Sequence, residues 1–327
     1  MIQKTLLALC MFFLAYKFAA AEPATVSFAS SGAVENGRIA FIKPSTRKII
    51  EMDLNGKITW EYVIPSKYSK ANFSIRGGAD INWIEKTDSF LIAVPKVGAI
   101  EVNRKGEVVW EYLTEEISHD IDLLEDGTLI FVNGWDSDTQ HILTRIDRAG
   151  KIIERYKADD LGLNKSERRY NVSSELYSNT HANAVQHLGQ GEYLLSLRNY
   201  NMAVTVQSGK IVSKIDNVRS IHDPVDLKGD IYFIRMDGPY SQRIVRFNKQ
   251  TQERSPLFST TDTSMTPMRT LEPLRNGNFL ITGSTMICQI SKDGDLVWSL
   301  KLSNFEHQTL GKTQNRDFIY KAAFVYK

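Results

Sequence analysis

Apolar and polar residues alternate in short runs along most of the chain, and polar turns that contain glycine separate the runs. The clearest runs follow a glycine by one residue and then alternate, which is the period of a half-buried β-strand. Five such runs occur: NGKITWEY from Asn55, KGEVVWEY from Lys105, AGKIIERY from Ala149, SGKIVSKI from Ser208 and DGDLVWSL from Asp293. Further short strands precede these turns, as in FLIAVPKVGAIEV and NFLITGSTMICQI. Helical periodicity of any length is absent, which weighs against a Rossmann or barrel enzyme.

The turns recur with a regular spacing. A period of roughly 40 to 50 residues with about four short strands is typical of a β-propeller. The gap between Gly209 and Gly294 fits two units, and FNKQTQERSPL near Lys249 supplies the turn between them. The sequence therefore predicts an all-β protein, a six-bladed β-propeller. Its units are expected to start near Arg38, Ala79, His119, His181, His222 and Arg269.

The two ends of the chain have separate interpretations. Residues 1–21 contain Lys4, an apolar stretch and Ala19-Ala20-Ala21, the pattern of a cleaved signal peptide. The mature chain, residues 22–327, is then one propeller domain in the periplasm or outside the cell, without stable membrane insertion. The tail DFIYKAAFVYK could add a strand that closes the propeller.

Charge and cysteine content narrow the function classes. The sequence has 40 Lys and Arg against 38 Asp and Glu, and removing Lys4 and Lys17 with the leader leaves 38 against 38. A neutral mature protein gives no reason to expect a nucleic acid as partner. Of the two cysteines only Cys288 remains after cleavage, in an apolar strand, so no intramolecular disulfide is expected. The sequence makes no prediction of oligomeric state.

Three histidines occupy one position of the repeat. When the units are aligned on their turns, His119, His181 and His222 begin the innermost strands of blades three, four and five, and Arg269 holds the same position in blade six. Innermost strands line the central channel of a propeller. Arg198, at the end of the next strand of blade four, is expected to return to the same mouth. A polar ring of this kind has no packing role, and a functional site is the better explanation.

Two chemistries suit three imidazoles. Three histidines can hold zinc with a fourth position open, but a fixed guanidinium such as Arg198 repels a dication. Beside imidazoles, the same guanidinium makes a site for a tetrahedral anion. A histidine could then act as a nucleophile that transfers an anionic group.

The residues at these positions resemble a known family. HDIDLLEDGTLIFVNG, THANAVQHLGQGEYLLSLRN, IHDPVDLKGDIYFIRMDG and GNFLITGSTMICQISKDGDLVW are similar to bacterial arylsulfate sulfotransferases. These are exported six-bladed propellers that move a sulfuryl group between phenols without the nucleotide donor PAPS. The similarity runs from about Ala79 to Leu300 and includes the three histidines and Arg198.

The resemblance implies roles for individual residues. His222 would be the nucleophile that is transiently sulfated, while His119, His181 and Arg198 hold the sulfate oxygens and manage the proton. Asn183 would donate a further hydrogen bond, and Arg269 is expected to bind substrate. Two imidazolium groups and a guanidinium would stabilise the developing charge.

The implied partners are a small phenolic sulfate donor and a phenol acceptor, with no cofactor, metal or nucleotide. Asp223 could orient His222, although adjacent side chains of a strand point to opposite faces, and a structural role is favoured.

Two alternatives remain open at this stage. A non-catalytic periplasmic binding or scaffold propeller would explain the repeat but not the histidines. A metal-dependent hydrolase or lyase could use the same channel.

Overall fold

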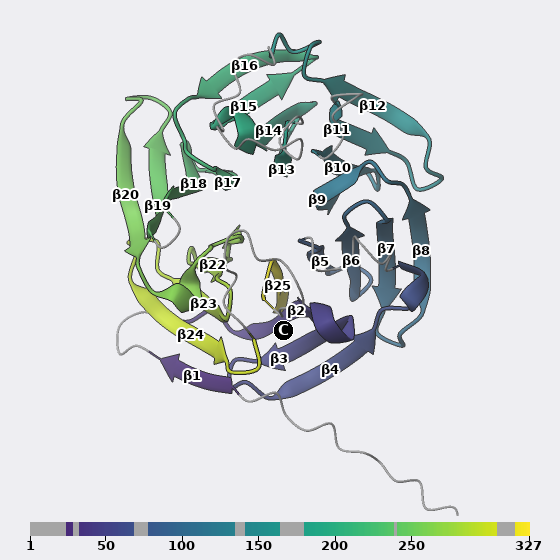
Figure 1. The fold of residues 1–327 in the computed structure, drawn as a ribbon, viewed down its shortest axis with the longest axis vertical. Coiled ribbons are helices and arrows are strands. Elements are labelled where there is room, and N and C mark those ends of the chain that lie inside the picture. The colour runs from purple at the N-terminus through teal and green to yellow at the C-terminus, as the bar shows by residue number, and fades with distance from the viewer. Residues whose placement is uncertain are drawn as a thin grey trace, which may run out of the picture.

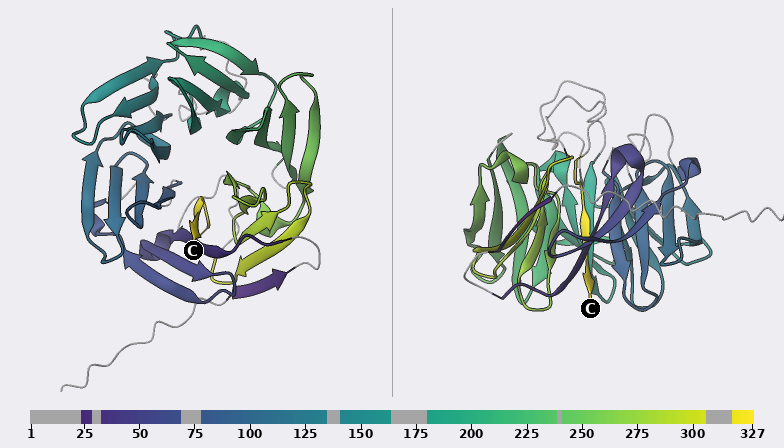
Figure 2. Two further views of the ribbon diagram at one scale, coloured as in Figure 1. Left: turned by 180° about the vertical axis from the view of Figure 1, so that it is seen from behind. Right: turned by 90° about the horizontal axis from the view of Figure 1, so that it is seen from below.

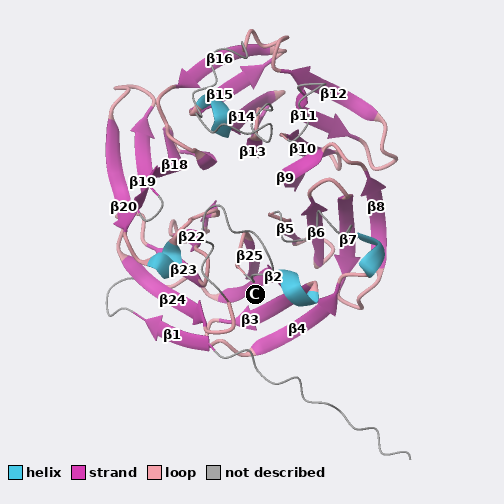
Figure 3. Ribbon diagram, in the orientation of Figure 1, coloured by secondary structure: helices cyan, strands magenta, loops and turns pink. Residues whose placement is uncertain are grey.

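The computed structural model describes residues 24–28, 33–68, 78–134, 141–163, 180–238, 241–305 and 318–327. They form six small antiparallel sheets that radiate from a central channel, so the predicted all-β six-bladed β-propeller is confirmed (Figure 1). From the side the blades form a short disc (Figure 2). Helical structure in the described ranges is limited to single turns (Figure 3): η1 (Pro44–Thr46), η2 (Ser66–Tyr68), η6 (Arg198–Tyr200) and η7 (Thr263–Met265).

Each blade consists of strands that follow one another outward from the channel. Blade two contains β5 (Asp80–Ile84), β6 (Ser89–Val94), β7 (Gly98–Asn103) and β8 (Val108–Leu113). Blade three contains β9 (Ile117–Leu123), β10 (Leu129–Asn133), β11 (His141–Ile146) and β12 (Ile152–Lys157). Blade four contains β13 (Ala182–Gly189), β14 (Glu192–Leu197), β15 (Met202–Gln207) and β16 (Lys210–Ile215). Blade five contains β17 (His222–Leu227), β18 (Asp230–Gly238), β19 (Ser241–Asn248) and β20 (Arg254–Thr260).

The two ends of the chain complete blades one and six. Blade one contains β25 (Ala322–Tyr326), β2 (Gly37–Lys43), β3 (Lys48–Asp53) and β4 (Ile58–Val63). Blade six contains β21 (Leu271–Pro273), β22 (Phe279–Thr282), β23 (Met286–Ile290), β24 (Leu296–Leu302) and, outermost, β1 (Ala24–Phe28).

Blade one corrects one sequence-based expectation. Arg38 lies in β2, which is the second strand of its blade, because β25 occupies the innermost place. The tail therefore does supply the closing strand, and Figure 1 shows it beside β2 near the channel. Strand β25 from the C-terminal end of the chain pairs with β2 from the N-terminal part, and this pairing closes the ring of blades.

The position of a strand within its blade determines how many of its residues are buried and apolar. Middle strands pack against a neighbouring blade on each face, so β6 (SFLIAV) and β10 (LIFVN) are buried at every position. The outer strand β8 (VVWEYL) is half covered, and its positions alternate between exposed and partly buried. Cys288 of β23 is fully buried in this apolar setting, as the sequence predicts.

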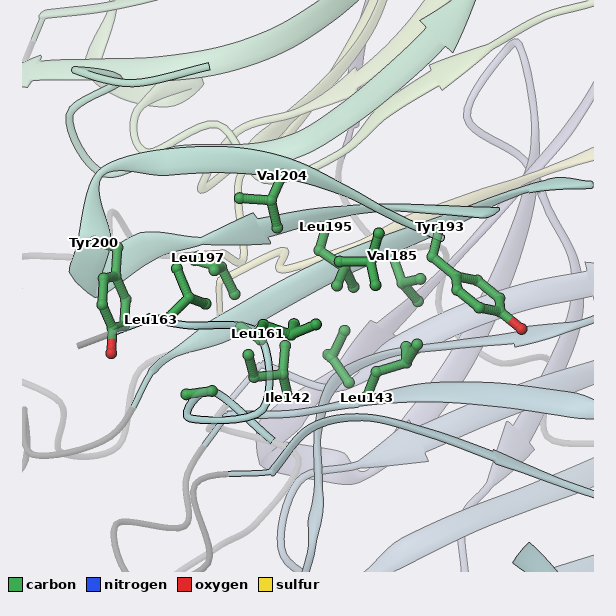
Figure 4. Packing of buried hydrophobic residues seen from close by; sticks show 14 of the residues in the cluster. Ile142, Leu143, Leu161, Leu163, Val185, Tyr193, Leu195, Leu197, Tyr200 and Val204 are labelled. Atoms are coloured by element: carbon green, nitrogen blue, oxygen red, sulfur yellow. The ribbon is translucent and has the colours of Figure 1, made fainter. Parts of the chain in front are cut away.

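Blades three and four show this packing at close range (Figure 4). Ile142 and Leu143 of β11 meet Val185, Leu195 and their neighbours from the facing sheet in one continuous apolar cluster. Tyr193 lies at one end of the cluster and Tyr200 at the other, and both are buried. The interior side chains of these two sheets thus pack blade three against blade four.

The repeated turn motif has a structural role between blades. In blade one, Asp53 Oδ1 accepts hydrogen bonds from the backbone N–H groups of Asn55 and Lys57, and Gly56 has a φ of 81°, which favours glycine. Trp110 of the outer strand β8 then reaches the turn of the next blade, since its Nε1 donates to Arg148 O at 2.8 Å. Similar bonds join Trp60 to Arg104 O and Trp298 to Leu54 O.

Several predictions concern residues outside the described ranges. The predicted signal peptide, residues 1–21, lies there, and export to the periplasm stays a prediction. Within the described part of the chain, no helix has the length and apolar character needed to cross a bilayer.

Candidate active site

The residues that begin the innermost strands gather at one end of the channel. His119 belongs to β9, His222 begins β17, and His181 and Arg269 come just before β13 and β21. Arg198 begins η6, the turn that follows β14 of blade four. The structure therefore brings together the three histidines and the two arginines that the sequence singles out.

Irregular pairing sets apart the three strands that carry histidines. The register between inner and second strand shifts between Ile117 and Ile121 in β9, between Ala182 and Ala184 in β13, and between His222 and Val225 in β17. The inner strands of blades one, two and six pair without a shift. β-bulges re-aim side chains and are frequent beside active sites. The bulges turn the start of each histidine strand toward the channel.

Positive φ values at the same places strengthen this interpretation. His181 has a φ of 49°, and Ser220 and Asp223, on either side of His222, have values of 48° and 45°. Residues other than glycine avoid this region, at a cost of about 1–3 kcal/mol each, and such strain clusters at functional sites. The bulge at Asp223 also explains why the adjacent His222 and Asp223 both approach the channel, contrary to the alternation of a regular strand.

Direct contacts connect the polar groups. The ring centroids of His119 and His181 are 5.5 Å apart, and Arg198 Nη1 lies 3.1 Å from His181 Nε2. Arg198 Nε donates to Ser220 Oγ at 3.4 Å, which links blade four to the residues that precede His222.

Tyr320 completes the ring of residues at the blade starts, from blade one. Its ring stacks on His119 with centroids 5.0 Å apart, and the Arg269 guanidinium lies 5.6 Å from its centre. Tyr320 lies two residues before the closing strand β25, so the signal that could have found it was the repeat position of DFIYKAAFVYK in blade one.

His222 is held in a defined tautomer. Its Nδ1 lies 2.8 Å from Ser220 O, and a carbonyl oxygen only accepts hydrogen bonds, so Nδ1 carries the proton. The other ring nitrogen, Nε2, then holds the lone pair when the ring is neutral. The ring is buried, so this lone pair is kept away from bulk water.

The electrostatics of the site favour neutral imidazoles. Burial, followed by the charges of Arg269 and Arg198, holds the pKa of His222 well below its usual range. Burial and Arg198 do the same to the pKa of His181, and burial lowers the pKa of His119 to about 3.

These shifts describe the site without an anion, in which the positive charge beside the histidine rings belongs to the guanidinium groups of Arg198 and Arg269. The expectation of two imidazolium groups around a bound sulfate stays a prediction. The two fixed guanidinium groups are suited to an anionic substrate, whose arrival offsets the repulsion that they exert on protonated histidine.

The two residues predicted to bind substrate differ in their surroundings. Arg269 is buried, and its Nη1 donates to Met268 O at 3.3 Å, so the guanidinium is fixed beside Tyr320. Asn183 is bonded between blades instead: its Nδ2 donates to Ile221 O at 3.2 Å, and its Oδ1 accepts from Ser196 Oγ. Asn183 therefore supports the segment before His222. Its role toward a ligand stays a prediction.

No group of three or more His, Cys, Asp and Glu side chains is arranged to hold a metal ion in the described ranges of the chain.

Gly78 supports His119 and Tyr320 from blade two. Its carbonyl accepts the hydrogen bond from His119 Nδ1 at 3.0 Å, which fixes the tautomer of that ring. A Cβ atom at Gly78 would stand 2.7 Å from both His119 Nδ1 and Tyr320 Cε2, and the φ of 98° itself favours glycine.

We expect Gly78→Ala to displace both rings and to lower kcat/KM with an aryl sulfate about tenfold or more, because small misplacements of reacting groups are costly. Gly127→Ala is the matched control. Gly127 also has a positive φ, of 83°, but a Cβ there meets nothing within 4 Å. Equal loss of activity in both variants would mean that backbone strain alone is responsible.

Comparison with known proteins agrees with the fold. The chain is similar to a protein of unknown function from Bacteroides caccae, with a TM-score of 0.57 and 14% identity over 90% of this chain and 100% of the other. It also matches a virginiamycin B lyase from Staphylococcus aureus, with a TM-score of 0.45, 12% identity and coverage of 68% and 70% of the two chains. At such identities the first likeness shows the fold alone, and the second adds nothing to it.

A search of curated proteins finds no significant match. The family comparison is more specific, since the model described as Arylsulfotransferase (ASST) matches residues 28–215, more than half of the chain. This range includes His119, His181 and Arg198. The protein therefore belongs to the arylsulfotransferase family, whose members act on small aryl substrates.

Proposed function

We propose that the protein moves a sulfuryl group from a phenolic sulfate ester to a phenol in two displacements, through a sulfated His222. The observation that carries the proposal is the hydrogen bond between His222 Nδ1 and Ser220 O. It leaves the Nε2 lone pair directed away from that carbonyl, in a site that also contains two guanidinium groups.

In the first displacement, Nε2 of His222 attacks the sulfur of the ester. The Nε2–S bond forms, the S–O bond to the phenol breaks, and the electron pair of that bond leaves with the phenolate. His222 keeps its proton on Nδ1, so the ring becomes positively charged while the attached sulfuryl group is negative. The hydrogen bond to Ser220 O strengthens as this positive charge develops.

The surrounding residues act on the charge of the group in transfer. Arg198 and Arg269 would hold the sulfuryl oxygens, whose negative charge accumulates as the bond breaks. His119 and His181 would hydrogen-bond the same group as neutral rings, and they would be able to take up a proton when the anion is bound. In the second displacement the oxygen of an acceptor phenol attacks sulfur while its proton passes to the neutral ring of His119 or His181. The new O–S bond forms, the Nε2–S bond breaks with its electron pair returning to Nε2, and neutral His222 is regenerated. Over the whole cycle this proton goes to the phenolate of the donor, which leaves as a phenol.

No nucleotide or prosthetic group takes part in this proposal. An aryl sulfate already carries the activated sulfuryl group, because a phenolate is a good leaving group. A single site can serve the donor phenol and then the acceptor phenol, since the two occupy it in turn.

The proposal is tested by brief exposure of the protein to a chromogenic aryl sulfate without acceptor, followed by an alkaline quench and peptide mass spectrometry. We expect one sulfuryl group on the peptide that spans Ser220 to Lys228, and loss of this label when a phenol is added before the quench. A protein that turns over the ester without any label on this peptide would contradict the covalent mechanism.

A further inference from the structure

A buried ion cluster lies in the channel next to the site. Lys321 Nζ is 2.6 Å from Asp120 Oδ1, 3.1 Å from Asp223 Oδ1 and 3.6 Å from Asp80 Oδ1. The side chains of Lys321 and Asp223 are 10% and 14% exposed, and those of Asp80 and Asp120 less. We call these four residues the lysine hub. The mechanism proposed above uses none of them.

The aspartates of the hub also join neighbouring blades. Asp80 of blade two accepts a hydrogen bond from Ile121 N of blade three at 3.0 Å. Asp120 accepts one from Val185 N of blade four at 2.6 Å, and Asp223 accepts one from Leu271 N of blade six at 2.8 Å. The innermost strand of a blade has one unpaired edge, and these carboxylates satisfy N–H groups on it.

The hub is adjacent to the proposed active site along the chain. Asp120 follows His119, Asp223 follows His222, and Lys321 follows Tyr320. The bulges in β9 and β17 let both members of each His-Asp pair face the channel. A change in the separation of Asp120, Asp223 and Lys321 must therefore move the rings of the preceding residues.

The hub contains more carboxyl groups than cations. Asp122 and Glu272 also face it, and all five carboxylates line one cavity of about 230 Å³ together with Lys321. Burial raises the pKa of Asp120 to about 7, against the attraction of Lys321, and raises the pKa of Glu272 to about 8. The pKa values of Asp122 and Asp223 are raised in the same way. On the other side, the cations of Arg198 and Arg269 lower the pKa of His222.

We propose that Lys321 is a positioning residue for sulfuryl transfer: through Asp120 and Asp223 it sets the places of His119 and His222 around the substrate. This inference rests on the proposed function. Lys321 directly precedes β25, the strand that closes the propeller. The C-terminal segment would therefore contribute to the reaction as well as to the fold.

Removal of the lysine charge has a predictable dependence on pH. In Lys321→Met, Asp120 and Asp223 lose the cation that lowers their pKa values, so both pKa values rise further. A larger fraction of these two side chains is ionised at pH 8.5 than at pH 6, and without the lysine their negative charges repel one another and separate the blade starts. At pH 6 more of them are protonated, the repulsion falls, and the rings return toward their places.

The test compares single-turnover rates of sulfuryl transfer in Lys321→Met and in the wild type at both pH values. We expect the rate relative to wild type to fall about 100-fold at pH 8.5 and about tenfold or less at pH 6, the scale of a displacement near 1 Å. Asp120→Asn/Asp223→Asn/Lys321→Met should recover most of the rate at pH 8.5, because its hub keeps its size without those charges.

The matched control is Lys249→Met. Lys249 forms an ion pair of 2.6 Å with Asp226 outside the hub, with 44% of its side chain exposed. Its rate should equal that of the wild type at both pH values. A Lys321→Met protein with a wild-type rate at pH 8.5, or with the same relative loss at both pH values, would overturn the inference.

A second measurement does not depend on activity. In long-range ¹H–¹⁵N spectra of labelled histidine rings, Lys321→Met should shift the signals of His119 and His222 at pH 8.5 and leave His187 unchanged. The triple variant should restore the wild-type positions. A wild type that transfers no sulfuryl group would refute the proposed function, whereas unchanged His119 and His222 signals would refute the hub independently.

Discussion

Replacing His222 with asparagine is expected to lower kcat for sulfuryl transfer on the order of 10⁴-fold or more, the loss typical of removing a covalent nucleophile. Asparagine keeps a hydrogen-bonding group of moderate size but has no nitrogen lone pair that can attack sulfur. Release of chromophore from a chromogenic aryl sulfate in the presence of excess phenol measures the effect. The variant should also fail to acquire the sulfuryl label on the Ser220 to Lys228 peptide.

His187→Asn is the matched control for this variant. His187 lies in β13 of blade four, where its ring contacts Tyr193 with centroids 5.4 Å apart, away from the channel residues. We expect wild-type activity from it. A fully active His222→Asn protein would contradict the proposed mechanism, because sulfuryl transfer would then not require His222.

Replacing Arg198 with methionine is expected to lower kcat/KM about 10²- to 10³-fold, because a fixed donor to the transferring group is lost. Arg198→Lys should recover only part of this loss, since an ammonium group cannot contact His181 and Ser220 with two separate nitrogens. Arg246→Met is the control, because Arg246 pairs with Asp230 at 2.7 Å outside the site and has 49% of its side chain exposed.

The same variant should change the pH profile. Arg198 is one of the cations that lower the pKa of His222, so its removal raises that pKa toward the usual value. His222 must be neutral to attack, and the acid limb of kcat/KM should therefore move to higher pH in Arg198→Met. An unchanged acid limb would show that another group controls it. Arg246→Met should leave the limb in place.

The sequence predicted much of the fold because the propeller repeats. Every blade has a turn with favoured residues followed by an alternating strand, so local pattern and spacing are sufficient to count the blades. The innermost strand of blade one was placed wrongly at Arg38, since β25 comes from the other end of the chain. Strand β1 of blade six was missed for a similar reason: its pairing partner, β24, is distant in the sequence.

The sequence predicted which residues form the candidate site but not the protonation state of its histidines. A shared repeat position identified four of these residues from the sequence alone: His119, His181, His222 and Arg269. The neutral charge of the histidines was not visible, because it depends on burial together with the two arginines. Tyr320 and the lysine hub were also missed, since each forms only when the closing strand meets the blades before it.

The sequence alone determined the six-bladed architecture and the repeat position that His119, His181, His222 and Arg269 share, because both follow from a period along the chain. Tertiary structure decided which nitrogen of His222 carries the proton, which groups are charged, and how Lys321 meets three aspartates from separate blades. These properties depend on distances between blades and on the exclusion of water, and neither quantity is contained in local sequence.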